Sequence, residues 1–166
     1  MLKNFLLLLL LLFHSNTFGI EKNTLTFHHT PKKIQDINLI DLNNKTLDFK
    51  DLSKKIIIIN FWATWCPPCV KEIPDLLKLQ TEFSKKLSVL FISVDSSPEN
   101  VIPKFKKKNK FKDFIVFTDQ DFKISNLLEI KKMPTTLIIK DGLEISRVEG
   151  YFDWLSPEVK KKIQDL

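Results

Sequence analysis

The chain has 166 residues, of which 43% are hydrophobic and 28% charged, and its formal net charge is +6. This length and composition fit one ordinary domain with a hydrophobic core and argue against a disordered chain. Only three glycines are present, so neither a G-x-G-x-x-G dinucleotide turn nor a P-loop can be written in the sequence. All histidines lie at or before His29, which leaves Ser-His-Asp and Cys-His catalysis without a candidate base in the core.

The first 19 residues have the pattern of a secretory signal peptide. Lys3 precedes an apolar run from Phe5 to Phe13, and small and polar residues follow up to Gly19. The run is much shorter than the roughly 20 residues of a transmembrane helix, so an uncleaved membrane anchor is the weaker alternative. We therefore expect residues 1–19 to be a signal peptide and the protein to be exported, with a periplasmic location.

The positive charge comes from lysines that cluster at residues 104–112 and 160–162. A solvated helix face is the plain interpretation of these clusters. Association with an acidic partner or an anionic membrane surface is the functional alternative, because lysine-rich segments attract negative charge over a long range. Binding to nucleic acid is not expected, since the chain has no nucleic-acid-binding motif and export separates it from nucleic acid.

Residues 20–33 have little hydrophobic periodicity and are expected to form a flexible lead-in, with the folded domain over residues 34–166. The elements expected in that domain are, in chain order, a hairpin over 37–49 with its turn at 43–44, a buried strand over 55–62, a helix after Cys69 that Pro74 kinks, a strand over 89–94, a helix beginning at Pro98, a strand over 114–117, a short helix over 121–128, a strand over 135–139, a turn at 141–142 into a strand over 144–149, and a helix after Ser156.

Local chemistry supports these elements. The isoleucine-rich run at 55–62 suits a strand that is buried on both faces of a mostly parallel sheet. Ser97 and Ser156 each precede a proline and a glutamate, which is the order expected for an N-cap followed by the first turn of a helix. Strands that alternate with helices and end in a hairpin predict an α/β fold, with a mixed central sheet and helices on both faces.

Cys66 and Cys69 enclose two prolines at the boundary between the buried strand and the helix. Unpaired backbone N–H groups and the helix dipole stabilise an anion at a helix N-terminus, so a thiolate at Cys66 is favoured. We expect Cys66 to attack a disulfide and Cys69, one turn further along, to resolve the mixed disulfide. Pro67 and Pro68 restrict the loop and remove two N–H donors, which tunes the reduction potential in a direction that the sequence does not fix.

Metal binding is the alternative for this cysteine pair. A closed structural zinc site takes four ligands, and the chain has no second cysteine pair. Cu(I) needs fewer ligands and prefers thiolates, so a Cu(I)-binding carrier is the alternative from a different functional class. Redox chemistry of the dithiol, without a metal, is the preferred interpretation.

The segment from Phe61 to Cys69, with Glu72 and the later run Met133-Pro134-Thr135-Thr136, resembles the TlpA-like family of extracytoplasmic thiol:disulfide oxidoreductases. The resemblance covers about residues 34–166. It implies a thioredoxin fold with an N-terminal β-hairpin and an extra strand and helix between Val89 and Phe117. It also implies that the chain has no bound organic cofactor and acts on protein disulfides or dithiols, including apocytochrome c thiols in some members.

The same resemblance assigns roles around the cysteines. Pro134 matches a cis-proline that faces the active site, and Asn60 stands where ordinary thioredoxins carry a buried aspartate. Glu72 matches an acidic residue near the sulfurs, and it lies three residues after Cys69 on the same helical face. A partly buried carboxylate with a raised pKa can accept the proton of Cys69 as Cys69 attacks. A first-turn glutamate favoured by the helix dipole is the plain alternative.

The residues expected to contact the substrate lie around Cys66: Trp65, Pro67, Pro68, Met133 and Pro134. Trp65 is expected to be an exposed platform, whereas Trp62 and Trp154 are expected to pack in the core. Lys132 stands where many relatives have glycine, and Met133 is not the usual β-branched residue. The contacts with the substrate are therefore expected to differ from those of relatives.

Together these features predict a secreted or periplasmic reductase of protein disulfides, which a membrane-embedded thiol donor would recharge. A dithiol oxidant or isomerase is the first alternative, but the chain has neither room for the helical insertion of a DsbA-type oxidant nor a histidine between its cysteines. A peroxidase motif would need proline and threonine where the chain has Ile59 and Ala63.

Overall fold

The computed structural model describes residues 24–34, 37–52, 55–111 and 114–166. The expected signal peptide at residues 1–19 and the first residues of the expected lead-in lie outside these ranges. Within the described residues, no helix combines the length and the apolar character needed to span a membrane.

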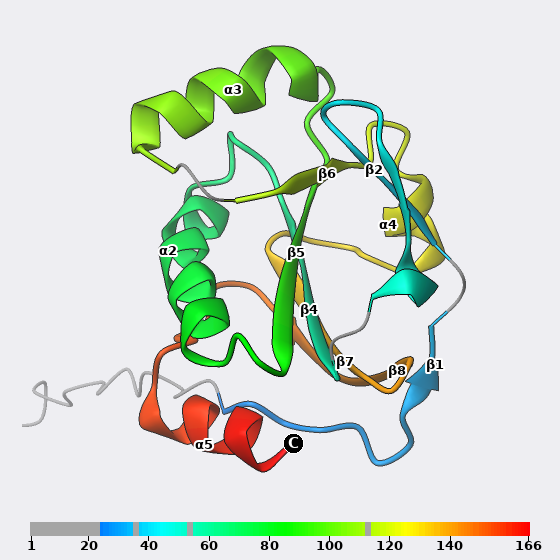
Figure 1. Ribbon diagram of the computed structural model, residues 1–166, viewed down its shortest axis with the longest axis vertical. Helices are drawn as coiled ribbons and strands as arrows, with labels where there is room; N and C mark the ends of the chain where they lie inside the picture. Colours follow the sequence, from blue (N-terminus) through cyan, green and yellow to red (C-terminus); the bar gives the residue numbers. More distant parts are fainter. Residues whose placement is uncertain (1–23, 35–36, 53–54, 112–113) are drawn as a thin grey trace, which may run out of the picture.

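A mixed sheet of eight strands crosses the described part of the molecule in the order β1-β8-β7-β4-β5-β6-β2-β3 (Figure 1). The strands are β1 (Lys32–Lys33), β2 (Asn38–Asp41), β3 (Thr46–Asp48), β4 (Ile56–Trp62), β5 (Leu87–Ser93), β6 (Val116–Thr118), β7 (Thr135–Lys140) and β8 (Leu143–Glu149). β4, β5 and β6 are parallel, and every other neighbouring pair is antiparallel. The expected mixed sheet and N-terminal hairpin are confirmed.

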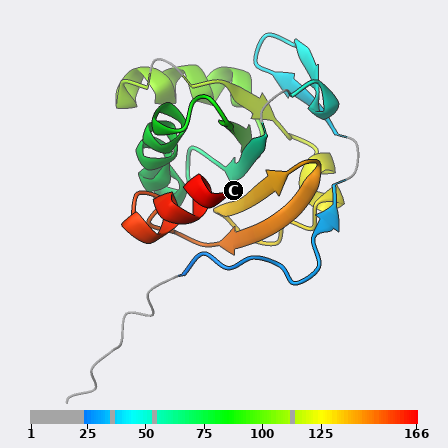
Figure 2. The ribbon, with the colours of Figure 1, turned by 60° about the horizontal axis from the view of Figure 1, so that its bottom comes forward.

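Helices cover both faces of this sheet (Figures 1 and 2). They are the 3-10 helix η1 (Phe49–Asp51), α2 (Pro67–Glu82), α3 (Pro98–Asn109), α4 (Lys123–Leu127) and α5 (Pro157–Asp165). Buried side chains of α2, α3 and α5 join one hydrophobic cluster, and those of η1 and α4 join a second. The fold is that of thioredoxin, and the region between Val89 and Phe117, where an extra strand and helix are expected, contains α3 and the short strand β6.

β4 shows how the sequence builds the centre of the fold. Its whole length is buried, as its β-branched run predicts. Ile56 and Ile58 face the cluster beneath α2, whereas Ile57 and Ile59 face the opposite cluster, because side chains alternate along a strand. By the same alternation Asn60 lies on the α2 side of the sheet, so a polar side chain is placed beneath the helix that carries the cysteines.

The helix starts differ in how they are capped. The Ser156 hydroxyl accepts a hydrogen bond from the backbone N–H of Val159 at 3.3 Å, as expected of an N-cap. Ser97 occupies the same position before α3, but its side chain makes no capping hydrogen bond. Ser97 therefore has the expected N-cap position, with Pro98 as the first helical residue, but its side chain does not satisfy a backbone N–H of α3.

The expectation of a flexible lead-in is wrong for residues 24–33, and the fold begins before Ile34. Leu25 is fully buried in the cluster beneath α2, and the His28 N–H donates to the Ile145 carbonyl at 2.8 Å. β1 then pairs with β8 at the edge of the sheet. The physical reason is that β8 would otherwise present unpaired backbone groups, which the lead-in satisfies.

A buried ion pair fastens the lead-in to the rest of the domain. Arg147 donates two hydrogen bonds of 2.9 Å to the Glu144 carboxylate, and His28 Nε2 lies 3.0 Å from the same carboxylate. Burial opposes ionisation of Glu144, but the hydrogen bonds from Arg147 and His28 outweigh it and hold the pKa of Glu144 below its ordinary value. Arg147 also donates to the carbonyls of Leu128 and Glu129, so the Glu144–Arg147 pair joins β8 to the lead-in through His28 and to the end of α4.

Candidate active site

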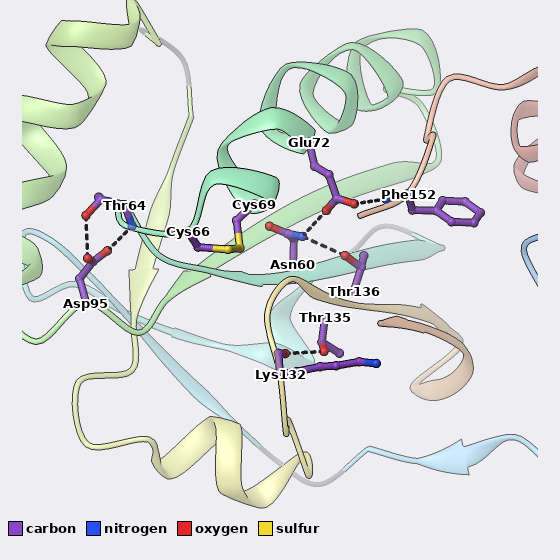
Figure 3. The surroundings of a disulfide bond; sticks show 10 residues. All are labelled: Asn60, Thr64, Cys66, Cys69, Glu72, Asp95, Lys132, Thr135, Thr136 and Phe152. Atoms are coloured by element: carbon purple, nitrogen blue, oxygen red, sulfur yellow. Dashed lines mark hydrogen bonds between the residues drawn. A yellow bond between two sulfur atoms is a disulfide. The ribbon is translucent and has the colours of Figure 1, made fainter. Parts of the chain in front are cut away.

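The two cysteines form a disulfide at the point where β4 passes into α2 (Figure 3). Their Cα atoms are 5.3 Å apart. Cys66 is the N-cap of α2 and is 6% exposed, whereas Cys69 lies inside the first turn and is fully buried. The structure therefore places Cys66 at the surface side of the pair, as expected of the attacking sulfur, and Cys69 behind it.

Pro67 and Pro68 occupy the first two positions of α2 and supply no backbone N–H. The first N–H of the helix that can face Cys66 Sγ is therefore that of Cys69. The next one, that of Val70, donates to the Cys66 carbonyl at 3.1 Å. The helix end thus offers Cys66 fewer donors than a helix without these prolines, while the helix dipole is retained.

The residues expected to contact the substrate surround Cys66. Trp65 is 64% exposed, which confirms its expected exposure, and both prolines at the start of α2 are exposed. The Met133–Pro134 peptide bond is cis, as the resemblance implies. Met133 packs against the cluster that contains both cysteines, and the loop of Lys132 passes below the disulfide in Figure 3. Trp62 and Trp154 are fully buried, as expected of packing residues.

Glu72 lies one turn after Cys69, and its carboxylate is fully buried between α2, β4 and the segment after β8. Its Oε1 accepts from the backbone N–H of Phe152, and its Oε2 lies 3.5 Å from Asn60 Nδ2. The indole N–H of Trp154 approaches the same carboxylate without reaching hydrogen-bond geometry. Glu72 is buried and α2 has no acidic residue in its first turn, so the plain alternative of a first-turn glutamate favoured by the helix dipole does not apply.

The environment raises the pKa of Glu72 from 4.5 to about 7. Burial is the largest cause, because it removes water from the charged form, and the nearby Asp75 adds a smaller effect in the same direction. The hydrogen bond from Phe152 and the donors of Trp154 and Asn60 oppose the increase. A carboxyl group with a pKa near neutrality can exchange a proton with a thiol under physiological conditions.

The segment after β8 connects Glu72 to the cis-proline. The Gly150 N–H donates to the Pro134 carbonyl at 2.7 Å, and two residues later the Phe152 N–H donates to Glu72. Gly150 has φ +89°, a conformation that L side chains rarely adopt. This turn was not anticipated from the sequence, although the single glycine after the expected last strand is the signal that could have indicated it.

Asp95 is a second residue that the sequence analysis did not single out. It is buried after β5, and its carboxylate accepts from the Thr64 N–H at 3.0 Å, from the Thr64 hydroxyl at 2.7 Å and from the Ser93 hydroxyl at 2.8 Å. Thr64 stands two residues before Cys66. Asp95 therefore anchors the loop that presents Trp65 and Cys66 (Figure 3).

The described residues contain no group of three or more His, Cys, Asp or Glu side chains arranged to hold a metal ion. What the arrangement does provide is a sulfur pair, a neighbouring acid of raised pKa and an exposed aromatic surface, which together suit exchange between thiols and disulfides.

Comparisons with known proteins agree with this chemistry. The model of the AhpC/TSA family matches residues 30–148. The chain is 30% identical over 136 residues to the thiol-disulfide oxidoreductase ResA of Bacillus cereus, which covers 76% of this chain and 78% of that protein.

Two solved structures share the fold at low sequence identity. A thiol:disulfide interchange protein of the thioredoxin family from Chlorobium tepidum superposes with a TM-score of 0.67 at 21% identity, over 82% of this chain and 97% of its own. StoA from Bacillus subtilis superposes with a TM-score of 0.61 at 20% identity, over 79% of this chain and 95% of its own. From the family match and the similarity to ResA, the chain belongs to the AhpC/TSA family and, within it, to the TlpA-like thiol:disulfide oxidoreductases.

Proposed function

We propose that this protein works outside the cytoplasm as a reductant of protein disulfides, through the dithiol form of Cys66 and Cys69. The observation that carries the proposal is the Cys66–Cys69 disulfide at the N-terminus of α2, with the buried Glu72 one turn away. The disulfide is the form that such a reductant has after it has reduced its substrate. Export through a signal peptide at residues 1–19 is part of the proposal.

In the first step, the Cys66 thiolate attacks one sulfur of the substrate disulfide. A bond forms between Cys66 and that sulfur, the substrate S–S bond breaks, and the other substrate sulfur leaves as a thiolate. Cys66 is suited to this step because it is the less buried cysteine and because the N-terminus of α2 favours its anion. Trp65, Pro67, Pro68, Met133 and Pro134 are the proposed contact surface for the substrate.

In the second step, Cys69 attacks the Cys66 sulfur of the mixed disulfide. Glu72 takes the Cys69 proton and the Cys66–Cys69 bond forms. The bond between Cys66 and the substrate breaks, and the substrate sulfur that was bound to Cys66 leaves as a thiolate. Two electrons have then passed from the protein to the substrate. With a pKa of about 7, the ionised Glu72 is basic enough to accept a proton and the protonated form can release it again.

The cycle closes when another dithiol reduces the Cys66–Cys69 disulfide. We propose a membrane-embedded thiol donor for this step, and the cysteine pairs of apocytochrome c as one class of protein substrate. The ResA relative is named a thiol-disulfide oxidoreductase, which supports this type of exchange. No organic cofactor enters either step, because the two sulfurs carry the electrons.

Two cysteine variants test the order of the steps. Cys66→Ser should abolish the reduction of a protein disulfide such as that of insulin, whereas Cys69→Ser should accumulate a mixed disulfide with the substrate that survives non-reducing electrophoresis. Turnover by the Cys66→Ser protein, or an adduct that forms through Cys69 instead, would contradict the assignment of the nucleophile.

The direction of electron flow needs a separate measurement. The equilibrium between the dithiol and the disulfide is measured in a series of thiol–disulfide buffers, with alkylation and mass spectrometry as the readout. A reduction potential below about −220 mV is expected for a reductant, whereas a value above about −150 mV would favour a dithiol oxidant or isomerase. Stoichiometric Cu(I) binding without reductase activity would instead favour a copper carrier.

A further inference from the structure

In the side-chain amide of Asn60, the nitrogen donates a hydrogen bond, but the oxygen accepts none from the described residues. The side chain is fully buried in the middle of β4. Its Nδ2 donates to Thr136 Oγ1 at 2.8 Å and lies 3.5 Å from Glu72 Oε2. Its Oδ1 is buried and has no hydrogen-bond partner among the described residues. Buried acceptors are normally satisfied, so an unsatisfied one beside an active site calls for an explanation.

The free oxygen faces the cysteines. Figure 3 shows the amide oxygen of Asn60 pointing toward the Cys69 side of the disulfide, while the nitrogen points toward Glu72 and Thr136. The contacts agree with this view, because Asn60 lies near Glu72, and Glu72 follows Cys69 by one turn on the buried face of α2. Ionised Glu72 also fixes the amide orientation, since only the amide nitrogen can donate to a carboxylate.

The redox state of Cys69 decides whether Asn60 Oδ1 can find a donor. In the disulfide, neither sulfur carries a proton, so neither can donate a hydrogen bond. When a dithiol reductant supplies two electrons and two protons, the Cys66–Cys69 bond breaks and the Cys69 sulfur becomes a thiol. A thiol is a weak donor, and the Asn60 oxygen is a buried acceptor without a partner among the described residues.

We propose that Asn60 is a positioning residue that accepts a hydrogen bond from the Cys69 thiol in the reduced protein, and that it thereby stabilises the dithiol relative to the disulfide. The hydrogen bond also holds Cys69 as a thiol, turned toward the interior, until a substrate is bound to Cys66. The role in the cycle rests on the proposed function, whereas the effect on the redox equilibrium does not require any substrate.

The amide links the two groups that exchange a proton in the proposed cycle. The Asn60 nitrogen lies 3.5 Å from Glu72, and its oxygen points toward the Cys69 side, so in the reduced protein one side chain orients the acid and the thiol. A purely structural asparagine would act only through Nδ2, as a connection between β4, β7 and α2. Such an asparagine would affect the stability of the fold but would leave the redox equilibrium of the cysteines unchanged.

The test compares two substitutions, one that removes the Asn60 oxygen and one that removes the hydroxyl group to which the Asn60 nitrogen donates. Asn60→Leu keeps the approximate shape and removes the oxygen, whereas Thr136→Val removes only the partner of the amide nitrogen. We expect Asn60→Leu to lower the equilibrium constant for dithiol formation about tenfold, which is a decrease of about 30 mV in reduction potential. Thr136→Val should change that constant by less than about twofold. An unchanged constant in Asn60→Leu, or equal changes in both variants, would overturn the proposal.

A measurement on the unaltered protein covers the case in which Asn60→Leu does not fold. The ¹³Cγ resonance of Asn60 reports hydrogen bonding to its carbonyl oxygen. It should move downfield when the disulfide is reduced and return when the Cys69 thiol is ionised at high pH, while the exposed Asn43 amide stays constant. An Asn60 resonance that does not follow the thiol would overturn the proposal. Failure of the reductase function would appear instead as absent insulin reduction with this response intact.

Discussion

Asp95 holds Thr64 through both its backbone N–H, at 3.0 Å, and its hydroxyl, at 2.7 Å. Asp95 lies after β5 and Thr64 lies after β4, so the contact joins the ends of two parallel neighbouring strands. Ser93 donates to the same carboxylate at 2.8 Å. The position of the loop that carries Trp65 and Cys66 therefore depends on one buried carboxylate in the next strand's loop.

Asp95→Asn should weaken this anchor, because an amide has only one acceptor oxygen for the donors that converge on the carboxylate. We expect the free energy of unfolding to fall by about 1–3 kcal/mol and disulfide reduction to slow as the loop loses its position. Asp121→Asn is the matched control, since Asp121 is exposed and pairs with the exposed Lys123. The control should change stability by less than about 0.5 kcal/mol. Equal urea midpoints for both variants would contradict the anchoring role.

Glu72 should make the stability of the disulfide form fall as the pH rises. Its pKa is about 7 in the folded protein and 4.5 as a model group, so between these values the folded protein binds the proton and the unfolded chain has lost it. The stabilisation is complete below pH 4.5 and is lost as the pH rises through about 7. The shift corresponds to about 3 kcal/mol at most.

Glu72→Gln isolates this effect. The wild-type protein should lose up to about 3 kcal/mol more stability between pH 5 and pH 8 than the glutamine variant, measured by urea unfolding of the disulfide forms. Other titrating groups act equally in both proteins and cancel. In the reduced protein, the same substitution should remove the increase in the rate of resolution near pH 7. If stability and the rate of resolution depended on pH in the same way in the two proteins, Glu72 would have only a structural role.

A third prediction concerns the contribution of the lead-in to stability, through the two apolar residues Leu25 and Phe27. Leu25 is fully buried, whereas Phe27 is 41% exposed. Leu25→Ala should therefore cost about 2–4 kcal/mol through lost burial and the cavity left in the hydrophobic cluster, and Phe27→Ala should cost less than about 1 kcal/mol. Denaturant unfolding of both variants gives the comparison. A small effect of Leu25→Ala would mean that the lead-in does not contribute to the stability of the core.

The residues that the sequence analysis identified all have local signals. The spacing of Cys66 and Cys69 at a boundary between strand and helix identifies them as a redox pair. Helical periodicity then places Glu72 on the same face of the helix as Cys69. The position of Trp65 directly before Cys66 likewise predicts that its side chain is exposed. The isoleucine run of β4 likewise predicts burial from residue type alone, because only a strand covered on both faces accommodates so many consecutive β-branched residues.

The residues that were missed depend on contacts between distant parts of the chain. Asp95 and Thr64 are 31 positions apart, and an aspartate after a strand has no property that reveals its partner. Leu25 is an isolated apolar residue in a polar segment, so no hydrophobic period indicates that it reaches the core. The raised pKa of Glu72 was expected, but its contact with Phe152 depends on the turn at Gly150, which only the assembled fold shows.

Trp65 separates substrate contact from the chemistry of the cysteines. Its side chain is 64% exposed beside Cys66, so Trp65→Ala removes apolar surface without opening a cavity in the core. We expect a several-fold increase in KM for a protein disulfide, because a large aromatic surface contributes strongly to protein contacts. The rate with a small disulfide such as hydroxyethyl disulfide, and the stability of the fold, should change little.

Leu143→Ala is the matched control for Trp65→Ala. Leu143 is 38% exposed and is the first residue of β8. It pairs with Lys140, which pairs with Ile56 at the start of β4. It therefore lies at the opposite end of the sheet from Cys66, which follows the end of β4. The control should leave KM unchanged for both substrates. If Trp65→Ala slowed the small and the large substrate equally, Trp65 would act on the cysteines themselves and not as a surface for the protein substrate.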